Sequence, residues 1–486
     1  MKHRFTKYSV SLIGTLLIAA APGLLPFVTS VPSLLHGEVP MMVKKTSVLE
    51  EGENNTEESS IEKSISGFVE YENFTNTYGN QEFEDIVKKN ELRNNWKIKI
   101  GTETLYFQSN LNLYVHDDNR ESRVTRNMTI TGNPYEISFN ELYINYEFSI
   151  VRLRLGNQIH AWGTADVFNP TAYFNPMDMR EALSRDEDEL KQGVPSLAAL
   201  FYIGDSSIEL VYVPIHVPVL IPGSGTFWGI RYEERGYPVE VLDPRAMEIN
   251  GQNMAVGIQF ATNLWSTDFN INAYYGPDVE PIFRPIGTLA LIPDQPPSAA
   301  VLPEYRISPA VGFSFSKTLG KFVFQGEVAY FPMKPGVIDQ DLEADLPDFP
   351  FAVTTYHAMR SSLGINYFLP LEKIFPSHDG EAVLTIEWSR PTAFGAGEIM
   401  DPMLGDILSF RFDDTFLDSK LKVSLTSITD LNNASTMLMP EIGYTFTNGI
   451  SITAAYTWLH GGDNSFLGIY TNNDFFKVRL RYEYSL

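Results

Sequence analysis

The segment FKVRLRYEYSL, from Phe476 to Leu486, decides the fold class because its apolar and polar side chains alternate without a break. Successive side chains of a strand point to opposite faces, so the even-numbered residues share one face and the odd-numbered residues share the other. The even face is apolar or aromatic, and the odd face carries Lys477, Arg479 and Arg481. This pattern is typical of the strand that closes a transmembrane β-barrel, whereas in a soluble sandwich the apolar face would meet a second sheet.

The same alternation recurs along most of the chain from Ser64 onward, and this recurrence favours the barrel. Thr447-Asn448-Gly449 is a strong hairpin turn between two alternating runs. The clearest alternating runs span 65–71, 96–100, 105–115, 142–148, 151–155, 322–330, 384–388 and 442–458. The runs together predict an all-β, transmembrane antiparallel β-barrel of about 18 strands. Barrels of 14 or 16 strands stay open as alternatives, because the segments near 198–214 and 404–428 are ambiguous.

Composition excludes several classes of protein. The chain has 486 residues, 44% of them hydrophobic, yet beyond the N-terminus no apolar run reaches the roughly 18 residues that a transmembrane helix needs. The formal net charge of −24 argues against nucleic acid as a partner. The absence of cysteine excludes disulfides, thiolate metal sites and cysteine catalysis.

Three segments are expected along the chain. Residues 1–30 are predicted to be a signal peptide, because a basic start is followed by an apolar stretch. An uncleaved anchor helix is the alternative, but Pro22, Gly23 and Pro26 interrupt that stretch. Residues 31–63, rich in Glu, Asn and Ser, are expected to be an acidic disordered periplasmic tether. Residues 64–486 are expected to form the barrel.

The connections between the alternating runs differ in length in a regular way. Short turns, such as 149–150 and 447–449, alternate with long segments, such as 161–196 and 215–252. Short periplasmic turns and long external loops are the pattern of outer-membrane barrels. We therefore expect the outer membrane of a diderm bacterium as the location and outer-membrane lipids as partners, with the C-terminal strand recognised by the barrel-assembly machinery.

The most distinctive sequence is LRLGNQIHAWGTADVFNPTAYFNPMDMR, from Leu153 to Arg180. It resembles a family of large Gram-negative outer-membrane barrels that is catalogued only as a domain of unknown function. Members of that family end a strand with R-x-G-x-Q-x-x-x-W-G and continue into a loop with N-P-x-D. Phe174 departs from the small aliphatic residue that the family places before N-P. The matching positions here are Arg154, Gly156, Gln158, Trp162, Gly163, Asn175, Pro176 and Asp178.

The residue types of this loop suggest a constriction. Asn-Pro and Pro-Met-Asp favour turns, so the loop would fold back into the lumen and place Asp178 opposite Arg152 and Arg154. The alternative is that both arginines only pair with neighbouring wall carboxylates such as Glu147. The candidate residues for the lumen and constriction are Lys97, Lys99, Arg152, Arg154, Gln158, Trp162, Asn175, Asp178, Glu327, Arg479 and Arg481.

Two predicted external loops, 213–228 and 281–303, are unusually apolar. Side chains of this kind lose about 1–3 kcal/mol each when they stay in water, so these loops are expected to fold inward or pack together. They would form either a hydrophobic vestibule for a greasy substrate or a self-packed plug. Residues proposed to line the vestibule are Ile215, Val219, Phe227, Trp228, Phe283, Leu289 and Leu291. The family resemblance implies handling of hydrophobic compounds, by analogy with the long-chain fatty-acid transporters.

Metal binding and catalysis find little support. Asp339, Asp341, Glu343 and Asp345 alternate in one loop, but the glycine and distal glutamate of a helix-loop-helix calcium site are missing. No H-E-x-x-H or G-x-S-x-G motif occurs. We expect no enzyme activity, no cofactor and no specific metal site.

Three functions are compatible with these features of the sequence. The first is a channel that passes a small-molecule substrate, hydrophobic or amphipathic, by facilitated diffusion. The second is a general diffusion porin for ions and small hydrophilic solutes. The third is a surface adhesin or antigen that uses the long acidic loops. Bilayer conductance and solute uptake distinguish these functions.

Overall fold

The computed structural model describes residues 61–486, with gaps in the long connections. The gaps are 78–87, 118–128, 133, 182, 186, 223–225, 230–238, 242–248, 287–298, 339–352, 376–377, 396–398, 401–404, 463–464 and 466. The predicted signal peptide and nearly all of the predicted tether lie outside the described residues. The first barrel strand begins at Glu62, two residues before the predicted start of the barrel.

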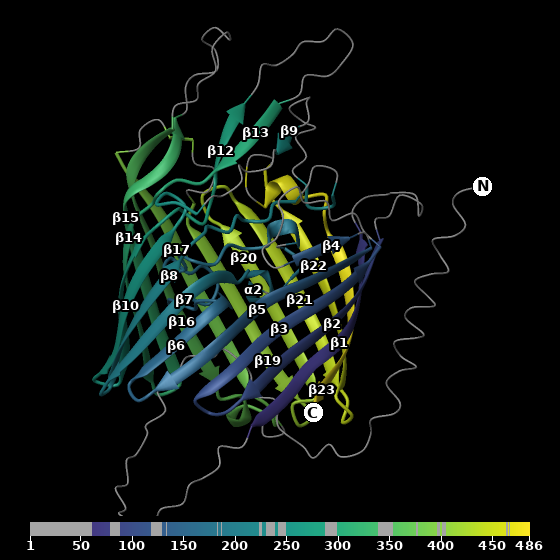
Figure 1. The fold of residues 1–486 in the computed structure, drawn as a ribbon. Helices are drawn as coiled ribbons and strands as arrows, with labels where there is room; N and C mark the ends of the chain where they lie inside the picture. The colour runs from purple at the N-terminus through teal and green to yellow at the C-terminus, as the bar shows by residue number, and fades with distance from the viewer. Residues whose placement is uncertain are drawn as a thin grey trace, which may run out of the picture. The chain divides into compact units, whose positions relative to one another are not determined.

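Eighteen antiparallel strands form a closed barrel, which confirms the predicted fold class and strand number (Figure 1). The barrel strands are β1 (Glu62–Asn76), β2 (Lys88–Gly101), β3 (Leu105–His116), β5 (Tyr135–Phe148), β6 (Val151–Gln158), β7 (Val194–Ile203), β8 (Ser206–Val213), β10 (Ala255–Leu264), β11 (Thr267–Tyr275), β14 (Ala310–Leu319), β15 (Phe322–Ile338), β16 (Val353–Leu369), β17 (Ala382–Phe394), β19 (Ile407–Phe416), β20 (Leu421–Asp430), β21 (Ser435–Thr445), β22 (Ile450–His460) and β23 (Phe475–Ser485).

The remaining elements are short and belong to the connections. They are β4 (Thr129–Gly132), β9 (Val239–Val241), β12 (Ile282–Ile286), β13 (Ala299–Glu304), β18 (Ile399–Met400), η1 (Met179–Glu181), α2 (Glu187–Leu190), η3 (Leu371–Lys373) and η4 (Gly468–Tyr470). Strands β9, β12 and β13 form a separate three-stranded sheet beyond one end of the barrel (Figure 1). Within the described residues, no helix is long and apolar enough to cross a bilayer.

The C-terminal strand closes the barrel, as its alternation predicts. Strand β1 pairs antiparallel with β2 on one side and with β23 on the other, in a register that runs from Ser66 opposite Ser485 to Asn76 opposite Phe475. Leu486 extends this pairing by exchanging two backbone hydrogen bonds with Ile65. The closed sheet therefore has no free edge along its wall.

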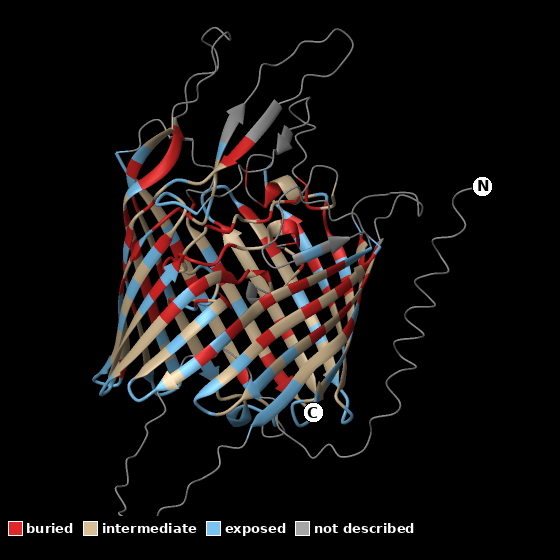
Figure 2. Ribbon diagram, viewed as in Figure 1, coloured by how far each residue is buried: buried red, intermediate tan, exposed pale blue. Residues whose placement is uncertain are grey.

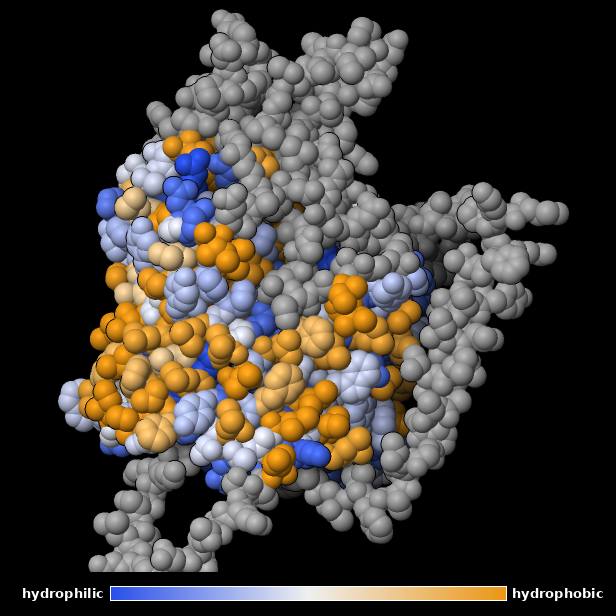
Figure 3. Space-filling view, in the orientation of Figure 1, coloured by the Kyte–Doolittle hydropathy of each residue, from blue (hydrophilic) through white to orange (hydrophobic). Residues whose placement is uncertain are grey.

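Alternation separates an apolar outside from a polar inside. On β23, Leu480 and Tyr482 point outward and stay 47% and 39% exposed, whereas Lys477 is buried inside the barrel. Apolar side chains gather in the same way over the outer face of many strands (Figure 3). An apolar outer surface around a polar interior is the arrangement that a lipid bilayer stabilises.

The connections at the two ends of the barrel differ in length, with two exceptions. Short turns join β2 to β3, β5 to β6 and most later pairs at one end, which we call the short-turn end (Figure 1). Connections at the other end, the long-loop end, are longer except for 431–434 between β20 and β21. At the short-turn end, 370–381 is the longer exception.

Candidate functional site

One long connection folds into the barrel and crosses it. Residues 159–193, between β6 and β7, are called the crossing loop, and they include η1 and α2. Buried segments inside the barrel are visible behind the front strands in Figure 2. The crossing loop contacts strands on both sides of the lumen, so it is the element that decides how much of the interior stays open.

Two buried glutamates of the wall hold the first half of the crossing loop. Glu327 on β15 accepts hydrogen bonds from the backbone N–H groups of Thr164, Ala165 and Thr171, at 2.8, 3.0 and 2.8 Å. Glu387 on β17 accepts three more, at 2.7–3.2 Å, from the backbone N–H groups of residues 166–168. Hydrogen bonds to an ionised acceptor are about twice as strong as neutral ones, so six of them fix this segment firmly.

Glu209 on β8 provides a third attachment point. It accepts a 2.8 Å hydrogen bond from the indole Nε1–H of Trp162 and forms a 3.0 Å ion pair with Arg154. The Trp162 ring is 1% exposed and meets the Phe174 ring edge-on, with centroids 4.9 Å apart. Trp162 of the motif is therefore an anchor that holds the loop to the wall.

Asn175 ties the two ends of the crossing loop together. Its Oδ1 accepts the backbone N–H of His160 at 2.7 Å, and its Nδ2 donates to the carbonyls of Gln158 and Gln192 at 3.0 and 2.8 Å. Gln158 is fully buried, and its amide donates to the backbone of Ser196 on β7. These contacts give the Asn and Gln of the motif a structural role.

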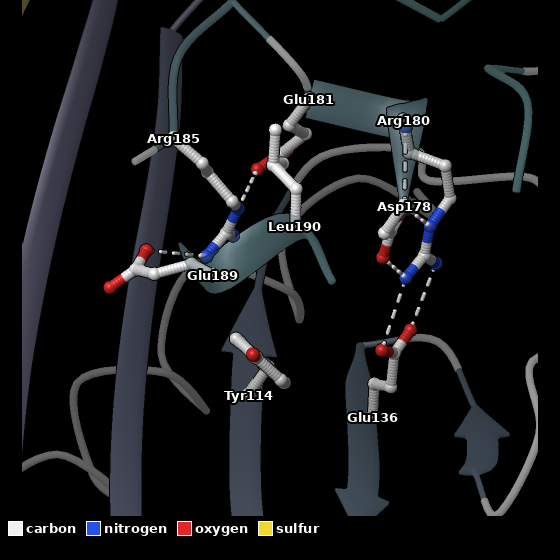
Figure 4. A pocket seen from close by; sticks show the side chains of 8 residues that line it. All are labelled: Tyr114, Glu136, Asp178, Arg180, Glu181, Arg185, Glu189 and Leu190. Atoms are coloured by element: carbon white, nitrogen blue, oxygen red, sulfur yellow. Dashed lines mark hydrogen bonds and ion pairs between the residues drawn. The ribbon is translucent and has the colours of Figure 1, made fainter. Parts of the chain in front are cut away.

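Ion pairs hold the second half of the crossing loop to β2, β5 and β23. Arg185 pairs with Glu91 at 2.8 Å, and Glu189 pairs with Arg93 at 2.5 Å. On β5, Glu136 receives Arg180 at 2.9 Å. The charged side chains surround a small polar cavity, and Figure 4 shows Arg180 between Asp178 and Glu136. The lining residues are Tyr114, Glu136, Asp178, Arg180, Glu181, Arg185, Glu189 and Leu190.

The wall beneath this network carries the predicted cations Arg479 and Arg481. Arg481 pairs with Glu70 at 2.7 Å and lies 3.6 Å from Glu189 of the loop, while Arg479 lies within 3.7 Å of Glu70 and Glu72. Burial alone would raise the pKa of Glu189, but Arg93, Arg185 and Arg479 hold that pKa well below its usual range. Glu189 therefore stays ionised and keeps the loop attached.

The sequence-derived constriction does not form in the predicted way. Arg152 pairs with Glu147 at 3.0 Å and Arg154 pairs with Glu209, while Asp178 pairs with Arg180 at 2.7 Å. Asp178 thus finds a cation within its own loop, and the two wall arginines of β6 find carboxylates on β5 and β8. Of the other candidates, Lys97 and Lys99 are exposed on the inner wall of β2.

The apolar loop residues have mixed surroundings. Trp228 is 5% exposed in a cluster with Phe74 and Phe475 at the long-loop end, and Phe227 packs against this cluster. Ile215 and Val219 are half-buried, and Phe283 is 41% exposed. The acidic candidates Asp339, Asp341, Glu343 and Asp345, like Leu289 and Leu291, lie outside the described residues. In the described part of the chain, no three His, Asp or Glu side chains gather as a metal site.

Sequence reasoning missed most of the loop's partners. An acidic run such as 186–189 is typical of a solvated loop, but Glu189 forms ion pairs with two arginines of the wall. Neither Glu209 nor Glu387 is among the sequence-derived candidates for the constriction. Their partners lie far away in the chain, so the available signal was only an inward-facing acid on an alternating strand.

Fold and site together define a class: a closed, apolar-surfaced β-barrel whose lumen is crossed by one of its own loops. The family model described as "Protein of unknown function (DUF1302)" matches residues 68–484, and the chain belongs to this family. The match extends from β1 to β23 and agrees with the expected family of unknown function. That the motif from Arg154 to Asp178 is a signature of this family stays a prediction. The analogy with fatty-acid transporters stays a prediction.

Comparison with curated proteins found no match. Among solved structures, the chain is similar to OccAB3 and OccAB1 of Acinetobacter baumannii and to OpdK of Pseudomonas aeruginosa, which was crystallised with vanillate. The sequence identities are 11%, 8% and 10%, and the TM-scores are 0.46, 0.48 and 0.45. Each similarity covers 87% of this chain, and 99%, 96% and 98% of the respective structures.

Proposed function

We propose that the chain is a channel in the outer membrane of a diderm bacterium and that it passes small amphipathic molecules by facilitated diffusion. The crossing loop is the observation that carries this proposal. It is attached to β15 and β17 on one side of the lumen and to β2 and β23 on the other. A partition held this firmly suits a channel that selects its solutes, and it disfavours a general diffusion porin.

The chemistry of the interior favours amphipathic over purely hydrophobic solutes. The inner wall carries charged side chains on many strands, among them Lys97, Glu147 and Arg411. A purely hydrophobic solute would displace water from these charges without replacing its hydrogen bonds, which is costly. Phe227 and Trp228, two of the candidates for a hydrophobic vestibule, pack into an aromatic cluster at the long-loop end.

Planar-bilayer recording tests both the channel and the role of the loop. The purified protein is expected to give small, discrete conductance steps. The double variant E327Q/E387Q removes two charges and leaves each side chain one oxygen acceptor for the loop amides. It is expected to loosen the loop and to give a larger and noisier conductance.

E441Q is the matched control, because Glu441 also lies on the inner wall, on β21, and no described residue of the crossing loop forms a hydrogen bond or ion pair with it. Its conductance is expected to equal that of the wild type. A wild-type protein without conductance would overturn the channel proposal. Equal conductance of E327Q/E387Q and the wild type would overturn the role of the crossing loop.

A further inference from the structure

Near the short-turn end, neighbouring strands of the inner wall carry tyrosines with cations over their rings. They come from β2, β3, β5, β6 and β7, which are consecutive in the barrel. We call this group the tyrosine patch, and it consists of Tyr106, Tyr143, Tyr202, Lys99, Arg152 and Arg154.

The three cations lie at interaction distance from the three rings. The distance from the charged group to the ring centre is 4.3 Å for Lys99, 5.5 Å for Arg152 and 6.0 Å for Arg154. A cation within about 6 Å of an aromatic ring is attracted by the negative face of the ring. The patch therefore presents flat π surfaces and positive charge at the same place.

A glycine on β6 lies beside one of these rings. Gly156 on β6 lies directly opposite Tyr143 on β5. Its φ is +139°, and a Cβ there would lie only 2.2 Å from the carbonyl oxygen of Leu142 and 2.7 Å from the Tyr143 Cα. Any larger residue at Gly156 would be strained, so the close approach of β6 to β5 beside Tyr143 requires a glycine.

Lys97 and Lys99 add positive charge to this part of the wall, where Glu141 on β5 lies close enough to interact with Lys97. Both side chains are exposed to the lumen, and neither forms an ion pair with any described residue. The two arginines of the patch, by contrast, are paired with Glu147 and Glu209. In a chain of net charge −24, two adjacent unpaired lysines on one face form a local site for an anion.

A buried amide at the base of the patch has unused hydrogen-bonding capacity. Asn145 lies opposite Tyr106 on one side and opposite Arg154 on the other. It is 0% exposed, and within the described chain neither its Nδ2 nor its Oδ1 has a hydrogen-bond partner. Most buried side-chain amides in proteins do have partners, so the environment of Asn145 is incomplete without a further polar group.

We propose that the tyrosine patch, together with Lys97, binds anionic solutes that carry an aromatic ring. The solute ring stacks on the tyrosines, and its negative group lies between the ammonium groups of Lys97 and Lys99. This inference rests on the proposed function, because it names the class of amphipathic solute that the channel would pass. It needs both features of the solute, since the tyrosines favour a flat ring and the lysines favour a negative charge.

Isothermal titration of the detergent-solubilised, folded protein tests the proposal with three matched probes. Phenylacetate carries both the ring and the charge, cyclohexylacetate carries the charge with a saturated ring, and phenylacetamide carries the ring without the charge. Phenylacetate is expected to bind about tenfold more tightly than either of the others. Equal binding of phenylacetate and cyclohexylacetate would overturn the role of the rings.

Variants test the residues. K97Q/K99Q is expected to weaken phenylacetate binding about tenfold. Y106L, which removes one ring and keeps an apolar side chain, is expected to abolish the advantage of phenylacetate over cyclohexylacetate. K422Q is the control, because Lys422 is an inner-wall lysine of β20 that pairs with Asp413, outside the patch. Equal binding by K97Q/K99Q and K422Q would overturn the role of the lysines.

The binding measurement also separates this inference from the proposed function. Normal conductance without binding of phenylacetate overturns the tyrosine patch as a site and leaves the channel intact. Binding of phenylacetate by a protein that does not conduct supports the patch as a site and overturns the channel.

Discussion

At the scale of single residues, the inner wall uses its carboxylates in two ways. Glu327 and Glu387 accept only hydrogen bonds from the chain, mainly from loop amides, and form no ion pair with any described residue. Glu70 and Glu91 instead pair with arginines. The first arrangement needs no cation and so is screened little by salt, whereas ion pairs that water reaches weaken as ionic strength rises.

His160 makes the docking of the crossing loop dependent on pH. It is 6% exposed, its Nε2 lies 2.9 Å from the Ser196 Oγ, and burial lowers its pKa to about 3 from an ordinary value of 6.5. An undocked loop would expose His160, which would then take up a proton below pH 6.5 while the docked form would not. Docking is therefore expected to weaken as pH falls from 6.5 towards 3, by about 2 kcal/mol at pH 5.

Hydrogen exchange of the loop amides at pH 7.5 and pH 5.0, corrected for intrinsic rates, measures this effect. The wild type is expected to lose protection at pH 5.0, and H160Q is expected to lose less, because glutamine does not titrate. The same pH dependence in both proteins would show that His160 does not control docking.

At the scale of elements, the crossing loop can approach β10 closely because of Gly257. A Cβ at this position would lie 2.5 Å from the Phe174 ring and 2.7 Å from the Trp162 ring. Both distances are shorter than any real Cβ contact, and both rings are buried between loop and wall. The loop can therefore occupy this position only because residue 257 on β10 has no side chain.

The variant G257V is expected to displace the crossing loop without unfolding the barrel, since overpacking of this kind typically costs about 1–3 kcal/mol. Single-channel conductance is expected to change, while the heat-modifiable migration of the folded barrel in gels stays the same. G364A is the control, because the nearest atom to a Cβ there is 3.5 Å away. A conductance unchanged in G257V would contradict the predicted contact.

The sequence predicted the elements well and their long-range contacts poorly. Alternation alone predicted that Leu480 points outward and that Glu327 points inward, because the direction of a strand side chain depends only on its place in the alternating pattern. The contact between Glu327 and Thr171 joins residues 156 positions apart, and that between Glu387 and Phe168 joins residues 219 apart. Such partners depend on where strands lie around the barrel, which local periodicity does not encode.

At the scale of the whole molecule, the apolar outer surface implies that the barrel is stable only in a bilayer or detergent. Leu480 lies at the middle of β23 and points outward. An arginine on the lipid face near the bilayer midplane typically costs about 2–4 kcal/mol, and this falls to about 0–1 kcal/mol near the interface. L480R is therefore expected to destabilise the barrel by the larger amount.

Urea unfolding in phosphocholine bilayers, followed by tryptophan fluorescence, measures this loss. I150R is the control, because Ile150 is 59% exposed in the turn between β5 and β6, at the short-turn end. Its expected loss is below about 1 kcal/mol. Equal losses for the two variants would contradict a lipid-facing belt centred on the strands.

The pairing of β1 with β23 also constrains how the protein is made. Glu70 and Arg481, which meet across this seam, are 411 positions apart in the chain. Until β23 is present, the sheet has two edge strands whose unpaired backbone groups another polypeptide could join. The barrel can therefore close only after β23 has been synthesised, and a chain without β23 would remain an open, aggregation-prone sheet.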